Sequence, residues 1–410
     1  MPRADIWRLR DQRYSILPRC KHHTSRFSSR LPYNTALFFR AAQSERLSNI
    51  TVDARPTWFQ FRTTQRNMTS QTKASKFKKP LSTPKPSASI LLVSPTNQIL
   101  LLHRVRTSSS FPSAHVFPGG NLSSEQDGEV PGPTDPARHE DSKVYRLGAI
   151  RECFEESGLL LATKKESPKE LLRLSDDERE QGRHAIHEDK VSFRQWVDQK
   201  SGIPDIDGLI PFTRWITPTN IPKRFTTQMY IYFLPVAKNE SSSAAGPLPV
   251  QSEALIPTPT SDGGIEHTAA RFLPPSKWLS MSQAGEIILF PPQFFLLHLL
   301  SPFLSPEDVP TVLDPEGLSR QREVVLNFVK SGDPPWGEKC MSPIGLFWKE
   351  SDGRAVLGLD KPGPELEGSG KRGDAERVVL VDFRKEGPRK VEVAWKKDVF
   401  QSEREGKEKL

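Results

Sequence analysis

Apolar residues in this chain of 410 residues gather into short runs that begin near Ser87. Residues 90–93 and 99–102 are continuous apolar runs around a turn-forming stretch at 94–97, and they predict two buried strands. A short strand is predicted at 115–117, where Pro118 and two glycines end it. The pattern then changes to a helical period, which predicts a helix from 143 to 162.

Strands and helices alternate irregularly in the rest of the chain. The pattern predicts helices at 175–189, 193–199 and 293–300, and strands at 209–217, 227–236, 269–273, 346–349, 378–382 and 391–395. Residues 121–142 are polar and rich in glycine, proline and aspartate, which predicts an inserted surface loop. Residues 239–264 lack any period, which predicts a disordered insertion. The chain is therefore expected to be an α/β protein with long loop insertions.

Composition divides the chain further. Residues 1–80 contain 17 Lys or Arg against four acidic residues, whereas the remainder has 41 basic and 46 acidic residues. An arginine- and serine-rich, acid-poor leader is typical of a mitochondrial transit peptide. The alternatives are a disordered leader, or translated sequence upstream of a later start at Met68. Since the body is slightly acidic, nucleic acid is not an expected partner. The predicted parts are a leader (1–80), a main domain (87–300), an extension packing on it (301–400) and a charged tail (401–410).

Several classes of protein are excluded. No run of 18 or more apolar residues occurs, so no membrane span is expected. Cys20, Cys153 and Cys340 are far apart, which fits neither a disulfide framework nor a zinc site. The final Lys409-Leu410 matches only the end of a peroxisomal signal, with Glu408 where a small residue is expected. Mitochondrial localisation is predicted, with the peroxisome and cytoplasm as alternatives; the oligomeric state is left open.

Three glutamates carry the candidate chemistry. On the predicted helix, Glu152, Glu155 and Glu156 occupy positions i, i+3 and i+4, so their carboxylates share one face. Such a cluster is either a solvated surface or a site for a divalent cation that prefers oxygen ligands, Mg²⁺ or Mn²⁺. The sequence Phe117-Pro118-Gly119-Gly120 upstream favours the second interpretation.

The stretch 151–158, Arg-Glu-Cys-Phe-Glu-Glu-Ser-Gly, resembles the core of the Nudix box. The resemblance implies an α/β/α sandwich with a mixed sheet that hydrolyses phosphoanhydrides with Mg²⁺ or Mn²⁺. It also implies that Glu152, Glu155 and Glu156 are metal ligands. The same three glutamates and Arg151 form the catalytic set that the resemblance implies. Gly119 and Gly120 would let the backbone approach metal or phosphate.

The box departs from the usual form in two ways. Thirty residues separate Gly120 from Arg151, where the usual box has about thirteen. The position of the first box glutamate, eight residues before Arg151, holds Lys143. Glu140, Asp141 or Asp127 could take its place.

The interruption itself resembles the motif-19 type of Nudix hydrolase. Segments that also resemble this type are 112–120, 215–218 (Trp-Ile-Thr-Pro), 224–226 (Arg-Phe-Thr) and 291–293 (Pro-Pro-Gln). This implies coenzyme A or acyl-CoA as the small-molecule diphosphate substrate, cleaved to 3′,5′-ADP and a phosphopantetheine derivative. The alternatives are a dinucleotide or nucleotide sugar as substrate, or a Nudix-fold binding module without activity.

Other candidate residues have less support from the pattern. Arg104, Arg106 and Arg224 could bind substrate phosphates or be structural. His103 and His115 are expected to be structural, because no triad or zinc pattern surrounds them. Glu266 could supply an additional carboxylate. Trp215 and Phe225 could stack on a purine, although packing in the core is the expected use.

Overall fold

A computed structural model describes residues 81–107, 112–236, 259–260, 267–304 and 314–408. The predicted leader, 1–80, and most of the predicted insertion at 239–264 lie outside these residues. So do Glu266 and the last two residues of the chain. The division into domains stays a prediction.

The central element is a mixed eight-stranded sheet in which β1 pairs in parallel with β8 and antiparallel with β2 and β4. The other neighbours are β7 with β8, β10 with β7, and β3 and β9 with β2. The strands are β1 (Lys85–Val93), β2 (Ile99–Arg104), β3 (His115–Val116), β4 (Gly119–Asn121), β7 (Ile210–Ile216), β8 (Phe225–Phe233), β9 (His267–Leu273) and β10 (Cys340–Met341).

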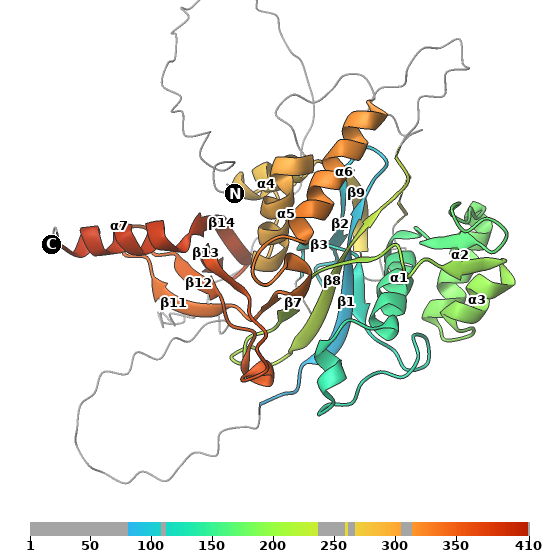
Figure 1. The fold of residues 1–410 in the computed structure, drawn as a ribbon, viewed down its shortest axis with the longest axis horizontal. Coiled ribbons are helices and arrows are strands. Elements are labelled where there is room, and N and C mark those ends of the chain that lie inside the picture. The colour runs from blue at the N-terminus through green and yellow to red at the C-terminus, as the bar shows by residue number, and fades with distance from the viewer. Residues whose placement is uncertain (1–80, 108–111, 237–258, 261–266, 305–313, 409–410) are drawn as a thin grey trace, which may run out of the picture. The chain divides into compact units, whose positions relative to one another are not determined.

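Helices cover both faces of this sheet (Figure 1). Alternate residues of β1 point to opposite sides, so Ile90 and Leu92 pack in one core cluster and Leu91 and Val93 in another. The first cluster includes α1 (Lys143–Ser157), α2 (Asp176–His187) and α3 (Phe193–Gln199). The second includes α4 (Pro275–Gln283), α5 (Pro291–Leu304) and α6 (Pro315–Val329). The predicted α/β/α arrangement is confirmed.

A small two-stranded sheet formed by β5 (Ala162–Lys164) and β6 (Gly202–Pro204) follows α1 in the chain. The C-terminal part forms a four-stranded antiparallel sheet of β11 (Ile344–Trp348), β12 (Ala355–Leu359), β13 (Asp374–Arg384) and β14 (Gly387–Trp395). One face of it shares the core cluster of α4 and α5, through Leu357 and Val379 among others. The other face packs against Val399 of α7 (Lys396–Glu408).

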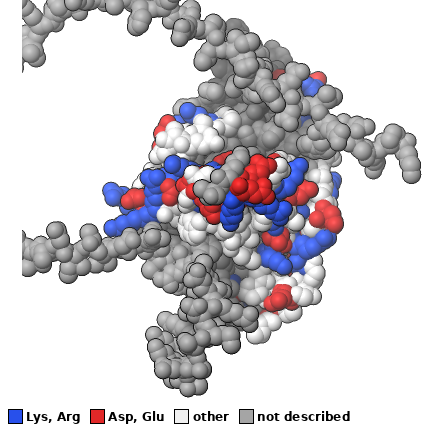
Figure 2. Space-filling model, turned by 90° about the vertical axis from the view of Figure 1, so that its left-hand side faces the viewer, with Lys and Arg blue, Asp and Glu red and all other residues white. Residues whose placement is uncertain are grey.

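Most of the predicted helices and strands are present, but the bounds predicted for two segments were wrong. The helix predicted to reach Ala162 stops at Ser157, because Gly158 adopts a left-handed conformation (φ 71°) that ends it. The charged residues at the C-terminus, predicted as a tail, continue helix α7 to Glu408. Figure 2, which looks at the side where α7 ends, shows Lys and Arg interspersed with Asp and Glu there. No helix among the described residues is both long and apolar enough to cross a bilayer.

Candidate functional site

Helix α1 presents its two faces to different surroundings. Ala149, Ile150, Cys153 and Phe154 are fully buried in the core cluster above β1. Since residues three and four apart share a helical face, Glu152, Glu155 and Glu156 are directed away from that core. Burial raises the pKa of the Cys153 thiol to about 12, so Cys153 is a packing residue of this helix.

Glu156 is held by the backbone of the glycine pair. Its Oε2 accepts a hydrogen bond from Gly119 N at 2.8 Å, and only 7% of its side chain is exposed. Gly119 has φ 153°, and a Cβ at this position would lie 2.3 Å from the carbonyl oxygen of Ala88. Only glycine therefore lets β4 approach β1 closely enough to donate to Glu156.

The second glycine lies against Glu152. A Cβ on Gly120 would stand 2.4 to 2.7 Å from the carboxylate atoms of Glu152, so this glycine leaves the space that the carboxylate occupies. The structure thus brings together Gly119, Gly120, Glu152 and Glu156, four of the residues that the sequence predicted for the site. Their roles stay predictions.

Arg151 and Asp127 form a buried ion pair beside the glutamates. Arg151 Nε and Nη2 donate to the two carboxylate oxygens of Asp127 at 2.8 and 2.9 Å, and the Asp127 side chain is fully buried. Arg151 Nη1 donates to Glu152 at 3.0 Å and to Glu155 at 2.8 Å. Burial disfavours the guanidinium charge, but these carboxylates outweigh it and raise the pKa of Arg151. Arg151 therefore fixes the rotamers of two site glutamates.

Asp127 is the one of the three acidic candidates that contacts Arg151. Glu140 instead pairs with Lys371 at 3.1 Å, and Asp141 pairs with Arg146 at 2.7 Å. Lys143, at the formal box position, is exposed in the first turn of α1. Asp127 lies seven residues after Gly120, about where the box expects its first acid. The insertion therefore falls between Asp127 and α1.

The inserted segment 121–142 was predicted to be a surface loop. This prediction was wrong at four of its residues, which are buried: Gln126, Asp127, Arg138 and His139.

Helix α2 supports the end of α1. Arg183 Nε and Nη2 donate to the backbone carbonyl of Glu155 at 2.9 and 2.7 Å, satisfying an acceptor in the last turn of α1. His187 Nδ1 lies 3.4 Å from Glu155 Oε2. The capping box of Ser175 and Glu178 defines where α2 begins.

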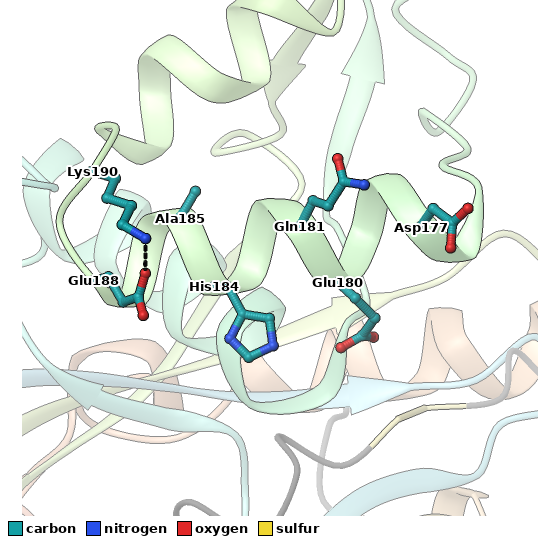
Figure 3. A pocket seen from close by; sticks show the side chains of 7 residues that line it. All are labelled: Asp177, Glu180, Gln181, His184, Ala185, Glu188 and Lys190. Carbon is teal, nitrogen blue, oxygen red and sulfur yellow. Dashed lines mark ion pairs between the residues drawn. The ribbon is translucent and has the colours of Figure 1, made fainter.

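Another face of α2 lines an open hollow (Figure 3). Acidic side chains, His184 and Lys190 surround it, and Lys190 pairs with Glu188 at 2.5 Å. None of the site glutamates lines this hollow. We assign no chemistry to it, because one helix face of solvated charges is an ordinary surface feature.

His267 is a site residue that the sequence interpretation missed. It begins β9, is fully buried, and its Nε2 lies 3.6 Å from Glu156 Oε1. The register of β9 on β2 places His267 opposite Arg104, which brings the backbone of that predicted phosphate ligand close to the site. The only sequence signal was position, since His267 directly follows the candidate Glu266.

Arg224 lies in a different environment. Its side chain is fully buried, donates to the backbone of Thr217 and Ser82, and pairs with Glu365. Its contacts are therefore structural. The substrate role of Arg224 stays a prediction, and none of its described contacts faces the glutamate cluster.

The two histidines and the two aromatic residues from the sequence also lie outside the glutamate cluster. His103 and His115 stack on each other at 4.8 Å, and burial lowers the pKa of His115 to about 4. Trp215 Nε1 donates to Thr213 at 3.0 Å, and its ring meets Phe295 edge-on at 5.8 Å. Trp215 is thus packed in the core, whereas Phe225 is half-buried.

The charge of the glutamate cluster bears on whether it could take a cation. Among the described residues, no three His, Cys, Asp or Glu side chains are grouped so that they could hold a metal ion by themselves. Mg²⁺ in proteins commonly keeps several waters and takes one or two carboxylates together with substrate phosphates. Burial, reinforced by Glu155 and Asp127 and opposed by Arg151, raises the pKa of Glu152 to about 7. Excess negative charge of this kind fits a divalent cation.

Comparisons with known proteins match this part of the chain. A family model described as the NUDT19 Nudix domain matches residues 135–300. The putative nudix hydrolase 7 of Caenorhabditis elegans is 30% identical over 216 residues, 52% of this chain and 60% of that protein. The acyl-coenzyme A diphosphatase NUDT19 of Gallus gallus is 26% identical over 257 residues, 52% of this chain and 63% of that protein. The chain thus spans less than two thirds of these relatives.

A solved structure, a NUDIX hydrolase from Alicyclobacillus acidocaldarius, superposes with a TM-score of 0.42 at 21% identity, covering 53% of this chain and 91% of that one. The family model begins at residue 135, so the glycine pair and Asp127 precede the matched segment. The resemblance drawn from the sequence is confirmed: over residues 135–300 this chain is similar to the Nudix hydrolases and, among them, to the NUDT19 type.

Proposed function

We propose that this protein hydrolyses a phosphoanhydride bond with the help of Mg²⁺ or Mn²⁺. The observation that supports it is the single turn of α1 on which Glu156 lies against Gly119 and Glu152 against Gly120, with Glu155 beside them on Arg151. Coenzyme A or acyl-CoA is the proposed substrate, because two relatives are named acyl-coenzyme A diphosphatases. The products would be 3′,5′-ADP and a phosphopantetheine derivative.

The bound cation would neutralise the diphosphate and acidify an attacking water. Each residue of the site has a proposed role in binding the cation or in moving the proton of the water. Glu156, oriented by Gly119 N–H, would be a cation ligand or accept the proton of the water. Glu152 and Glu155, held by Arg151, would complete the cation site. Asp127 is a positioning residue that acts through Arg151.

A panel of phosphoanhydrides tests this proposal. The full chain with Mg²⁺ or Mn²⁺ should cleave coenzyme A or an acyl-CoA faster than NADH, ADP-ribose or UDP-glucose, measured by release of the nucleotide. Preference for a dinucleotide or nucleotide sugar would overturn the substrate assignment. Tight binding of one compound without cleavage of any would indicate the binding module instead. A mitochondrial address in the leader is tested separately, by tagging each end of the chain in cells.

Replacing Gly120 with alanine is expected to lower the affinity for Mn²⁺ by about 10- to 100-fold, the usual effect of disturbing the support of a metal ligand. The added Cβ would meet the far end of the Glu152 side chain, which can move, so the fold should survive. Titration of Mn²⁺ by calorimetry measures the change. Gly132→Ala is the matched control, since a Cβ there has no neighbour within 4 Å. Equal affinities in the two variants would contradict the prediction.

Affinity for Mn²⁺ should also increase about tenfold between pH 6 and pH 8. Because the pKa of Glu152 is raised to about 7, most of its carboxyl is protonated at pH 6 and ionised at pH 8, and only the ionised form binds a cation. Calorimetry in buffers of different ionisation enthalpy would show proton release on binding. In Glu152→Gln the dependence should flatten. An affinity for the parent protein that is constant over this range would refute the assignment.

A further inference from the structure

An apolar cavity of about 270 Å³ lies between the main sheet and the C-terminal sheet, and we name it the β8 pocket. Its floor is formed by Met229 of β8 and Trp215 of β7, with Leu296 of α5 and Leu357 of β12 as walls. All four side chains are at most 6% exposed. The turn between β13 and β14 closes another side through residues 384–388. The C-terminal sheet thus supplies part of this pocket.

Three of the segments singled out in the sequence meet at this pocket. Trp215 to Pro218, Phe225, and Pro291 to Gln293 all line it, although they lie up to 78 residues apart in the chain. The metal chemistry proposed above uses none of them. A shared cavity gives these separate segments a common physical role.

The β8 pocket is adjacent to the strand that carries the glycine pair. Phe117 lines it and lies two residues before Gly119, whose N–H donates to Glu156. Thr227 also lines it and shares a 2.6 Å hydrogen bond with Ser87, the register partner of Asn121 in β4. The pocket lining belongs to the core cluster on the α5 face of the main sheet, whereas α1 packs on the other face, so a ligand that joins the two sites would pass the edge of the sheet at β4.

One polar atom stands out in the apolar lining. Gln293, in the first turn of α5, has a buried Oε1 without a hydrogen-bond partner in the part of the chain that the structure describes. A buried amide oxygen is costly to leave unpaired, and an amide N–H from a ligand would satisfy it. Lys223, Lys385 and Glu386 are exposed at the rim, so charge surrounds an apolar interior.

We propose that the β8 pocket binds the acyl-pantetheine arm of an acyl-CoA and selects for the length of the acyl chain. The arm combines amide N–H groups, which match Gln293, with an alkyl chain, which matches the apolar walls. This inference rests on the proposed function and adds the position and selectivity of the acyl subsite. The packed, edge-on ring of Trp215 favours an alkyl chain over a stacked purine.

The test is a substrate series from free CoA through acetyl-, butyryl- and hexanoyl- to octanoyl-CoA with the full chain and Mg²⁺. Each methylene that is fully buried should increase kcat/KM by about fourfold until the pocket is filled. Ile221→Trp, at a half-buried lining position, should flatten this dependence by occupying the space. Ile203→Trp on β6, 47% exposed and outside the pocket, is the matched control and should keep it.

Gln293→Leu is a second variant that keeps the pocket apolar. It should lower kcat/KM about tenfold for every member of the series, because all share the pantetheine arm, while the dependence on chain length persists. A chain-length dependence that is absent in the parent protein, or unaltered by Ile221→Trp, would overturn the proposal.

Octanoyl-pantetheine separates this proposal from the proposed function, because it has no diphosphate to cleave. Calorimetry should show that it binds the parent protein and binds Ile221→Trp at least tenfold more weakly. Binding of this kind without CoA cleavage would support the pocket and refute the proposed activity. CoA cleavage without such binding would do the reverse. Loss of 3′,5′-ADP binding in Ile221→Trp would assign the pocket to the nucleotide and overturn the acyl subsite.

Discussion

Glu156→Gln is expected to reduce kcat for phosphoanhydride hydrolysis by about a thousandfold, the range for removal of a catalytic carboxylate or metal ligand. The substitution keeps the shape of the side chain and one oxygen that can accept from Gly119 N, so β4 and α1 should stay in contact. It removes the negative charge that a cation or an attacking water requires. The fold should therefore survive while turnover and Mn²⁺ affinity fall together.

Single-turnover assays and Mn²⁺ titration measure the two effects of Glu156→Gln. Glu170→Gln is a matched control, since that carboxylate is 59% exposed and pairs with Lys164 away from the site. The control should retain the activity of the parent protein. If Glu156→Gln turned over substrate at the parent rate, the catalytic role of the three-glutamate turn would be wrong.

The part of the site that depends on local geometry could be predicted from the sequence. Positions i, i+3 and i+4 share a helical face wherever a helix forms, so the spacing of Glu152, Glu155 and Glu156 already placed them together. The same holds for Gly119 and Gly120, because two glycines after a short strand predict a close backbone approach. In both cases the residues that lie together in the structure are also close together in the sequence.

The partners that come from distant segments could not be predicted in this way. Arg224 could be a phosphate ligand or a structural residue by its sequence, and its pairing with Glu365, 141 residues later, could not be foreseen. His267 reaches Glu156 only because β9 pairs with β2. Asp127 was one of three candidates, and counting back from Arg151 across an insertion could not select among them.

The same limit applies to the fold. Helices α4 and α6 and strand β12 were not predicted, and each is completed by packing on other elements. Helix α7 is strongly charged, with Val399 as its one buried residue. Its position is stabilised by contacts such as the edge-on pair of Phe400 with Phe347 at 5.2 Å. Such contacts depend on tertiary structure, which a periodicity argument does not include.

Asp127→Ala is expected to lower the free energy of unfolding by about 1.5–3 kcal/mol, the usual worth of buried hydrogen bonds to a charged group, because Arg151 keeps Glu152 and Glu155 as partners. Arg151 is 5% exposed and would lose two charge-assisted hydrogen bonds. Urea denaturation measures the change. Asp198→Ala is the control, because its 70% exposed carboxylate pairs with Lys165 at the surface and should contribute at most about 1 kcal/mol.

The double variant Asp127→Leu with Arg151→Met separates stability from function. Removing both charges should restore part of the lost stability, because Asp127 and Arg151 then no longer leave each other unpaired, although Glu152 and Glu155 lose their cation. Activity should stay low, since nothing would then hold Glu152 and Glu155 in their present rotamers. A double variant that regained both stability and turnover would show that the pair serves the fold alone. Stability recovered without turnover would show that the Arg151–Asp127 pair serves the site and not only the fold.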